Sequence, residues 1–102
     1  MKAKHLIREK FRNSVFDRDN KKCRVCKKSG ELDAHHITDR NEMVNGGYVK
    51  ENGISLCTEC HLKAEKFHID KTWSNGFHPN DLYRLIGSSH GIAYKKSISL
   101  SK

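Results

Sequence analysis

Two CxxC pairs constrain this chain more than any other feature of its sequence. They are Cys23 with Cys26 and Cys57 with Cys60, and thirty residues separate the pairs. With 102 residues, 35% hydrophobic and 31% charged, we expect one domain whose thin core needs further stabilisation. The spacing suits either a zinc ion held by four thiolates or two disulfides.

The N-terminal segment bears on which of these two applies. Residues 1–10 are charged and lack the apolar stretch of a secretory signal, and no later segment has the length and apolarity of a membrane span. We therefore expect a cytoplasmic protein without a membrane partner. In that reducing compartment cysteines persist as thiols, which favours a zinc site. A closed shell of four sulfurs leaves no position for water, so this zinc is expected to be structural.

The charge of the chain indicates an anionic partner. Lys and Arg number 20 against 12 acidic residues, a formal net charge of +8. Such a positive field attracts polyanions, and nucleic acid is the leading candidate. A basic protein with no such partner is the alternative that charge by itself leaves open.

An amphipathic helix is predicted ahead of the first CxxC pair. Over residues 4–17, Ile7, Phe11 and Val15 recur every four positions and so share one helix face. Basic side chains occupy the remaining faces, which makes this a basic amphipathic helix.

Two adjacent histidines lie on a predicted strand. Residues 32–37, LDAHHI, alternate as a short strand does, so His35 and His36 should point to opposite faces and have different roles. Residues 38–51 are polar and predict a loop, which returns to a second strand at 53–56.

A helix is predicted to follow the second strand directly. Thr58 is its expected N-cap, and it extends to residue 67 or 68. His61, Glu65 and His68 stand at i, i+4 and i+7 and line one face, which can look back at the strand of the paired histidines. Another side, toward the core, is formed by Cys60, Ala64 and Phe67. A β-β-α unit results.

The C-terminal third gives weaker signals. After a loop at 73–78, Asn80 is the expected cap of a short helix that ends at Gly87. Residues 91–100 alternate apolar and polar side chains, which fits a strand added to this or another subunit's sheet, or a mobile basic tail. Both interpretations remain open at this stage.

The motifs LDAHHI, ENGISLC and CTECHLKAE, in this order and spacing, resemble the successive elements of HNH endonucleases that carry CxxC pairs. The resemblance covers residues 11–68 and leaves 69–102 as a C-terminal extension. It implies a small α+β fold: a ββα-metal unit held by a four-cysteine zinc site, with a flanking N-terminal helix and a short C-terminal helix.

The resemblance also implies roles for individual residues. His35 would bind a catalytic divalent ion, His36 would be the general base, and Asn52 would orient the loop of the base through hydrogen bonds. His61, nine residues after Asn52, would be the second metal ligand. Glu65 stands where many relatives have histidine, and its carboxylate still suits a divalent ion such as Mg²⁺, Mn²⁺, Ni²⁺, Co²⁺ or Zn²⁺.

These residue types suit hydrolysis of a phosphodiester. The reaction needs an activated water and a cation to offset developing negative charge. A neutral imidazole with a pKa near 6.5, as in His36, can accept the proton of that water. Arg40 is either a phosphate clamp that binds nucleic acid or an ordinary surface arginine. His68 is either an alternative ligand or a solvated charge at a helix end.

Two functions therefore compete. The first is a metal-dependent endonuclease that cuts DNA, expected to be double-stranded. The second is a non-catalytic, zinc-stabilised module that binds nucleic acid, in which the histidines are structural. The second does not account for His35, His36, Asn52 and His61 together. A monomer predicts nicking and a symmetric homodimer predicts double-strand breaks, and only the possible strand at 91–100 hints at a dimer.

Overall fold

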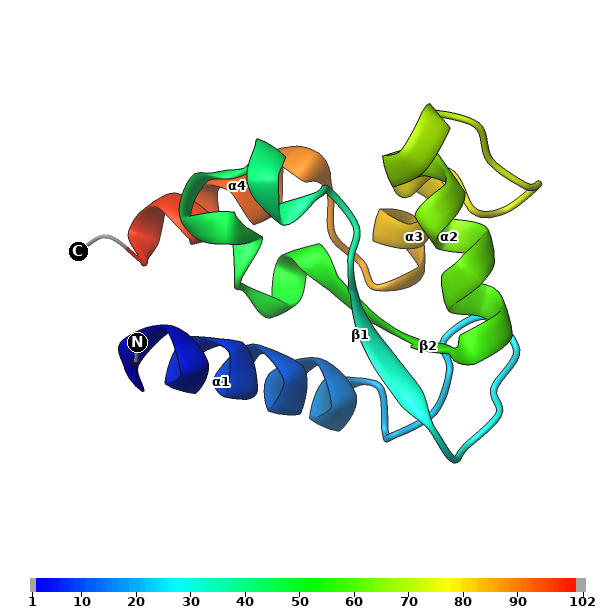
Figure 1. Ribbon diagram of the computed structural model, residues 1–102, viewed down its shortest axis with the longest axis horizontal. Helices are drawn as coiled ribbons and strands as arrows, with labels where there is room; N and C mark the ends of the chain where they lie inside the picture. Colours follow the sequence, from blue (N-terminus) through cyan, green and yellow to red (C-terminus); the bar gives the residue numbers. More distant parts are fainter. Residues whose placement is uncertain (1, 101–102) are drawn as a thin grey trace.

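Two short antiparallel strands lie at the centre of the molecule, between the long helix α1 and the helix α2 (Figure 1). The computed structural model describes the backbone of residues 2–100 and the side chains of residues 6–100. The elements in chain order are α1 (Lys2–Arg18), β1 (Leu32–His36), the 3-10 helices η1 (Arg40–Glu42), η2 (Val44–Gly47) and η3 (Lys50–Asn52), β2 (Gly53–Cys57), α2 (Thr58–Asp70), α3 (Pro79–Leu85) and α4 (His90–Ser99).

The strand register separates the two histidines as the alternation predicted. His35 pairs with Ile54 and His36 pairs with Gly53. Cross-strand partners point to the same face. His35 and Ile54 therefore share the face that α2 covers, whereas His36 and Gly53 face α1. The predicted small α+β fold with a β-β-α unit is confirmed.

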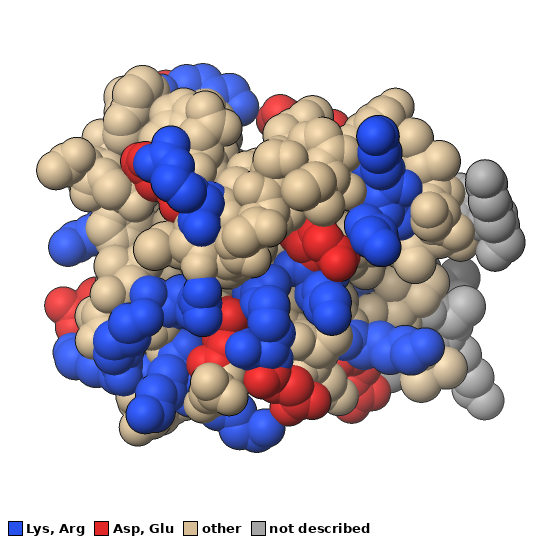
Figure 2. Space-filling view, turned by 180° about the vertical axis from the view of Figure 1, so that it is seen from behind, with Lys and Arg blue, Asp and Glu red and all other residues tan. Residues whose placement is uncertain are grey.

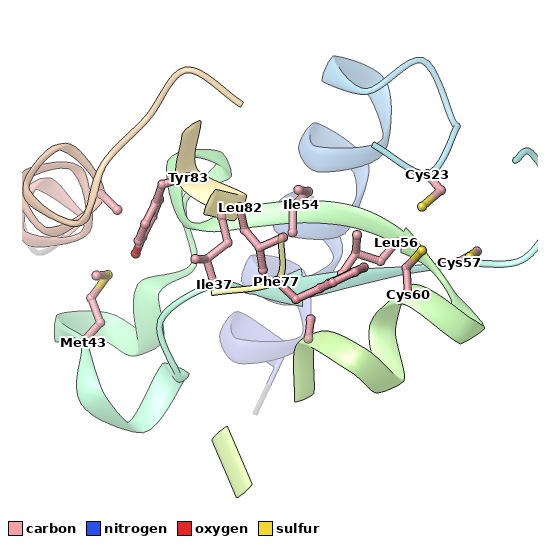
Figure 3. Packing of buried hydrophobic residues seen from close by; sticks show 12 residues of the cluster. Cys23, Ile37, Met43, Ile54, Leu56, Cys57, Cys60, Phe77, Leu82 and Tyr83 are labelled. Carbon is pink, nitrogen blue, oxygen red and sulfur yellow. The ribbon is translucent and has the colours of Figure 1, made fainter. Parts of the chain in front are cut away.

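The hydrophobic core lies between β2, α2 and the C-terminal helices (Figure 3). All five residues of β2 are buried, so this strand is the centre of the packing. Large, fully buried side chains of this core are Ile37, Ile54, Leu56 and Leu82. Two of them alternate on β2, as expected for the face that meets α2.

Helix α1 approaches β2 very closely, and Gly53 permits this. An added Cβ at Gly53 would lie 2.5 Å from Val15 Cγ2 and 2.7 Å from Phe11 Cε1. Phe11 and Val15 are buried, as the helical pattern predicted, whereas Ile7 is exposed. At the far end of α1 the buried carboxylate of Asp19 accepts a hydrogen bond from the backbone N–H of Ser55 in β2. Both contacts fix α1 against the strand pair.

The loop between the strands is more structured than predicted. Residues 38–51 were expected to be irregular, but they contain η1, η2 and most of η3. Each of these helices is short, and a positive φ at Asn45 and Gly46 interrupts η2. Turns this short carry no apolar stripe with helical periodicity, so the sequence pattern could not reveal them.

Both predicted helix caps are displaced. The N-cap of α2 is Cys57, and Thr58 is the first helical residue, because β2 runs into α2 without a connecting loop. The N-cap of α3 is His78 instead of Asn80. His78 Nδ1 accepts from the backbone N–H of Asn80, so histidine takes the role that Asn usually fills.

The prediction of a strand or a mobile tail at 91–100 was wrong. This segment forms α4, capped by Ser89, whose hydroxyl accepts from the backbone N–H of Ile92. The buried residues of α4 are the small Ala93 and Ser97, one helical turn apart, and they let α4 lie close to η2. The large apolar side chains at alternate positions are partly exposed. The indication of a dimer through an added strand therefore disappears.

No helix in the described part of the chain combines the length and the apolarity needed to cross a membrane.

Candidate active site and metal centres

The four cysteines come together at one end of the strand pair. Cys23 and Cys26 lie in the turn after α1, and Cys57 and Cys60 lie where β2 becomes α2. Their Sγ atoms all lie within 4.8 Å of one another, and those of Cys26 and Cys57 are 3.5 Å apart. Tetrahedral zinc with bonds of 2.3 Å separates its sulfurs by roughly 3.8 Å. The four residues are thus positioned to bind a metal ion, as predicted.

The backbone favours a thiolate in this cluster. Although burial raises the pKa of Cys23, hydrogen bonds from the backbone N–H groups of Cys26, Cys57 and Val25 lower it, and the net result is a pKa of about 6. Burial and the neighbouring thiols raise the pKa of Cys60. Four sulfurs at this distance cannot all ionise unless a cation is bound, so the donor set suits a divalent ion.

A second cluster of potential ligands lies where α2 crosses β1. His35 is 2% exposed, and its Nδ1 is buried and forms no hydrogen bond. Glu65 Oε1 lies 3.3 Å from His35 Nδ1 and 3.4 Å from His61 Nε2. Two ligands bound at 2.0–2.2 Å to one ion are roughly 3.0–3.4 Å apart. The spacing of Glu65 to each histidine therefore fits a shared metal ion, although His61 is not in the set of donors that all lie within 4.8 Å of one another.

His68 joins this cluster instead of lying in solvent. Its ring stacks on that of His35 at 5.0 Å between centroids, and its Nε2 is 2.8 Å from the backbone oxygen of His36. Donor atoms of His35, Glu65 and His68 all lie within 4.8 Å of one another. The interpretation of His68 as a solvated helix-end charge is not supported.

The charges in this cluster suit a cation. The close contact with His35, against the opposing effect of burial, lowers the pKa of Glu65 to about 2. Burial lowers the pKa of His35 below its usual value. At neutral pH the cluster therefore offers an ionised carboxylate and a neutral imidazole, the forms in which these groups bind metals.

His36 lies on the opposite face of β1, between two aromatic rings. It stacks parallel on Phe11 of α1, 4.4 Å between centroids, and meets the edge of Tyr48 at 5.2 Å. Burial, with a smaller contribution from the nearby His35, lowers its pKa to about 4, so the expectation of an unperturbed pKa near 6.5 was wrong. Its Nε2 is buried and forms no hydrogen bond.

Asn52 holds the chain immediately after the paired histidines. Its side chain is fully buried; Oδ1 accepts from the Thr38 backbone N–H at 2.9 Å, and Nδ2 donates to the Thr38 backbone oxygen at 3.0 Å. The hydroxyl of Tyr83 in α3 also donates to Asn52 Oδ1, at 2.6 Å. The Asn52 side chain thus fixes the backbone at Thr38, two residues after His36.

Arg40 lies beside the histidines on the exposed edge of a shallow hollow of about 350 Å³. The hollow is lined by the histidine–carboxylate cluster and by the second histidine of β1, that is by His35, His36, His61, Glu65 and His68 among others. The Arg40 guanidinium donates to the Tyr48 hydroxyl at 3.2 Å. The fold thus gathers His35, His36, Arg40, His61 and Glu65 around one hollow, while Asn52 lies behind it.

Sequence reasoning missed several residues that support the site. Asp33 Oδ2 lies 3.2 Å from His61 Nδ1, and Asp33 shares a strand face with His35 because the two are two positions apart. That alternation was readable from the sequence. Tyr83 lies 31 residues after Asn52, and Tyr48 lies four residues before it. No local pattern in the sequence connects either tyrosine to the site.

These features define a small α+β protein with a ββα unit, a four-cysteine cluster and a histidine–carboxylate cluster. Residues 23–67 match the family model described as HNH endonuclease, which confirms the resemblance that the motifs predicted. The matched segment starts at the first cysteine and ends in α2. No curated protein and no solved structure matches the chain. The family match indicates a function related to nucleases and nucleic acid.

Proposed function

We propose that this protein is a metal-dependent endonuclease that hydrolyses phosphodiester bonds of DNA, with His36 as the general base. The observation that carries the proposal is the buried Nδ1 of His35, which forms no well-aligned hydrogen bond. It faces the carboxylate of Glu65 in the same hollow that His36 lines. A buried polar atom without a well-aligned hydrogen bond is costly, and a cation bound between this nitrogen and the Glu65 carboxylate would satisfy both groups.

The proposed ligands of the catalytic ion are His35, His61 and Glu65. The carboxylate of Glu65 lies within 3.4 Å of a nitrogen of each histidine, and Asp33 is placed to orient His61 through its other nitrogen. A divalent ion such as Mg²⁺, Mn²⁺, Ni²⁺, Co²⁺ or Zn²⁺ bound there would offset the negative charge that develops on the phosphate. We assign a structural zinc ion to Cys23, Cys26, Cys57 and Cys60.

His36 would remove a proton from the attacking water through Nδ1. Its low pKa keeps the imidazole neutral at pH 7, the form required of a base. A neighbouring phosphate anion favours the protonated form and raises the pKa, so substrate binding would strengthen the base as it is needed. Phe11 holds the ring in place, and the contact of His68 with the His36 backbone oxygen positions that residue.

Arg40 and Asn52 would have supporting roles. Arg40 is exposed at the edge of the hollow, where its guanidinium can bind the scissile phosphate with two parallel hydrogen bonds. Asn52 fixes the backbone at Thr38, two residues after His36, and so sets where β1 ends.

Single-turnover cleavage of a labelled DNA duplex tests these assignments across a titration of divalent ions. We expect His35→Ala to raise the metal concentration needed for the half-maximal rate, because a ligand is lost. His36→Ala should lower the maximal rate by a factor of about 100 or more and leave the metal requirement unchanged.

The opposite pattern would reassign the two histidines. Absence of cleavage by the wild type in every metal, together with retained DNA binding, would favour the non-catalytic zinc-stabilised module instead.

A further inference from the structure

We propose that Arg8 and Tyr48, together with Arg40 on the boundary with the scissile phosphate, form a second phosphate-binding subsite, which takes a DNA phosphate next to the scissile one along the same strand. This inference rests on the proposed function, which puts the scissile phosphate in the neighbouring hollow at His36. It extends the DNA contact from the β-β-α unit to α1, which lies outside the matched family segment.

Two guanidinium groups converge on one neutral oxygen at this place. Arg8 Nε donates to the Tyr48 hydroxyl at 3.3 Å, and Arg40 Nη1 donates to the same hydroxyl at 3.2 Å. Among the described side chains, neither arginine forms an ion pair. Two cations that share one neutral acceptor repel each other, and an anion bound between them would relieve that repulsion.

The subsite is built by a constrained loop. Gly46 has φ of 66°, and an added Cβ there would lie 2.6 Å from the Tyr48 ring. Glycine at this position therefore allows the phenol to lie across the loop. The other edge of the ring meets Phe11 and His36, at 5.9 and 5.2 Å between centroids. Tyr48 thus connects the general base of the proposed reaction to the two arginines.

The subsite lies in a groove that continues from the active-site hollow. This groove, of about 660 Å³, runs between α1 and the η1–η2 loop and is lined by Arg8, Lys10, Arg40, Asn41 and Tyr48, among others. Arg40 and Asn41 also line the active-site hollow, so the two depressions share one boundary. The groove also has apolar lining from Ile7 and Leu100, and its cationic side chains lie where the neighbouring phosphate of a strand bound at His36 would pass.

The wider charge distribution agrees with this path. Lys and Arg side chains are numerous along the α1 side of the molecule (Figure 2). Lys10 of α1 adds a third cation to the groove. A duplex carries one phosphate per 3.4 Å of its axis on each strand, so an extended basic edge meets several phosphates at once.

The test is the salt dependence of DNA binding, measured by fluorescence anisotropy on a zinc-loaded His36→Ala protein so that the duplex stays intact. Arg8→Gln is added to this background, and Lys66→Gln is the matched control. Lys66 carries the same charge and is exposed, on the side of α2 away from the histidine cluster.

We expect Arg8→Gln to weaken binding several-fold for every duplex sequence and to reduce the slope of log affinity against log salt by about 0.9, the value for one lost phosphate contact. Lys66→Gln should leave the slope unchanged. An unchanged slope for Arg8→Gln, or an equal loss for both variants, would overturn the subsite.

This outcome is independent of cleavage, because binding is measured with the base removed. If the wild type cuts no DNA and Arg8→Gln still reduces the salt slope as predicted, the subsite is supported and the nuclease assignment is rejected. If Arg8→Gln reduces the salt slope for binding to single-stranded RNA and leaves the slope for duplex DNA unchanged, DNA is rejected as the ligand.

Discussion

Replacement of Asn52 by alanine tests how much of the loop after β1 depends on one buried amide. The side chain forms hydrogen bonds of 2.9 and 3.0 Å with the Thr38 backbone and accepts a hydrogen bond of 2.6 Å from the Tyr83 hydroxyl. A fourth contact, to the Gly47 backbone oxygen, is longer at 3.4 Å. Three good bonds at about 1 kcal/mol each give about 3 kcal/mol, and the stranded Thr38 N–H adds to this cost.

Urea unfolding of the zinc-loaded protein measures the effect. With a slope of about 1.5 kcal/mol per molar urea, a loss of about 3 kcal/mol lowers the midpoint by about 2 M. Asn41→Ala is the control, since Asn41 is exposed and only its backbone N–H forms a hydrogen bond in the described structure; we expect a change below about 0.5 kcal/mol. A loss below about 1 kcal/mol for Asn52→Ala would refute the reasoning.

Three further changes have defined outcomes. In thermal unfolding, Gly53→Ala should destabilise the fold by about 1–3 kcal/mol, because the added Cβ would overlap Val15 and Phe11. Gly91→Ala is the control: its added Cβ has no close neighbour, so this change should be neutral or stabilising. The pKa of His36 is about 4 in the fold against 6.5 when unfolded, so the unfolded state binds more protons between these two pH values. The free energy of unfolding should therefore fall by about 2 kcal/mol from pH 7 to pH 5. In denaturant titrations, His36→Phe should remove that portion of the pH dependence. Removal of metal by a strong chelator should unfold the protein, as followed by circular dichroism, with recovery on zinc addition; full retention of the fold would reject the structural role of the four cysteines.

The periodic part of the fold was predictable because it depends on local sequence. The alternation in LDAHHI placed His35 and His36 on opposite faces, and the i, i+4, i+7 spacing placed His61, Glu65 and His68 on one side of α2. CxxC pairs specify their own geometry, since two sulfurs three positions apart can share one ion. These elements carry most of the candidate site.

The remainder depends on contacts between distant segments. The sequence around Tyr83 shows nothing that directs its hydroxyl to Asn52, and that bond exists only because α3 packs over the loop. Residues 91–100 alternate like a strand but form α4, since Ser89 caps a helix and the small Ala93 and Ser97 pack against η2. Tertiary packing creates the Tyr83–Asn52 bond, and packing together with the Ser89 cap outweighs the strand-like alternation of residues 91–100.

The relaxation of supercoiled plasmid tests the proposed activity most directly. Wild type and His36→Ala, both zinc-loaded, are incubated with plasmid in each divalent ion, and supercoiled, nicked and linear forms are separated on a gel. We predict that the wild type cuts in at least one ion while His36→Ala binds the plasmid and leaves it supercoiled. Equal cutting by both proteins would contradict the role of His36, and retardation without cutting by either would contradict the nuclease assignment itself.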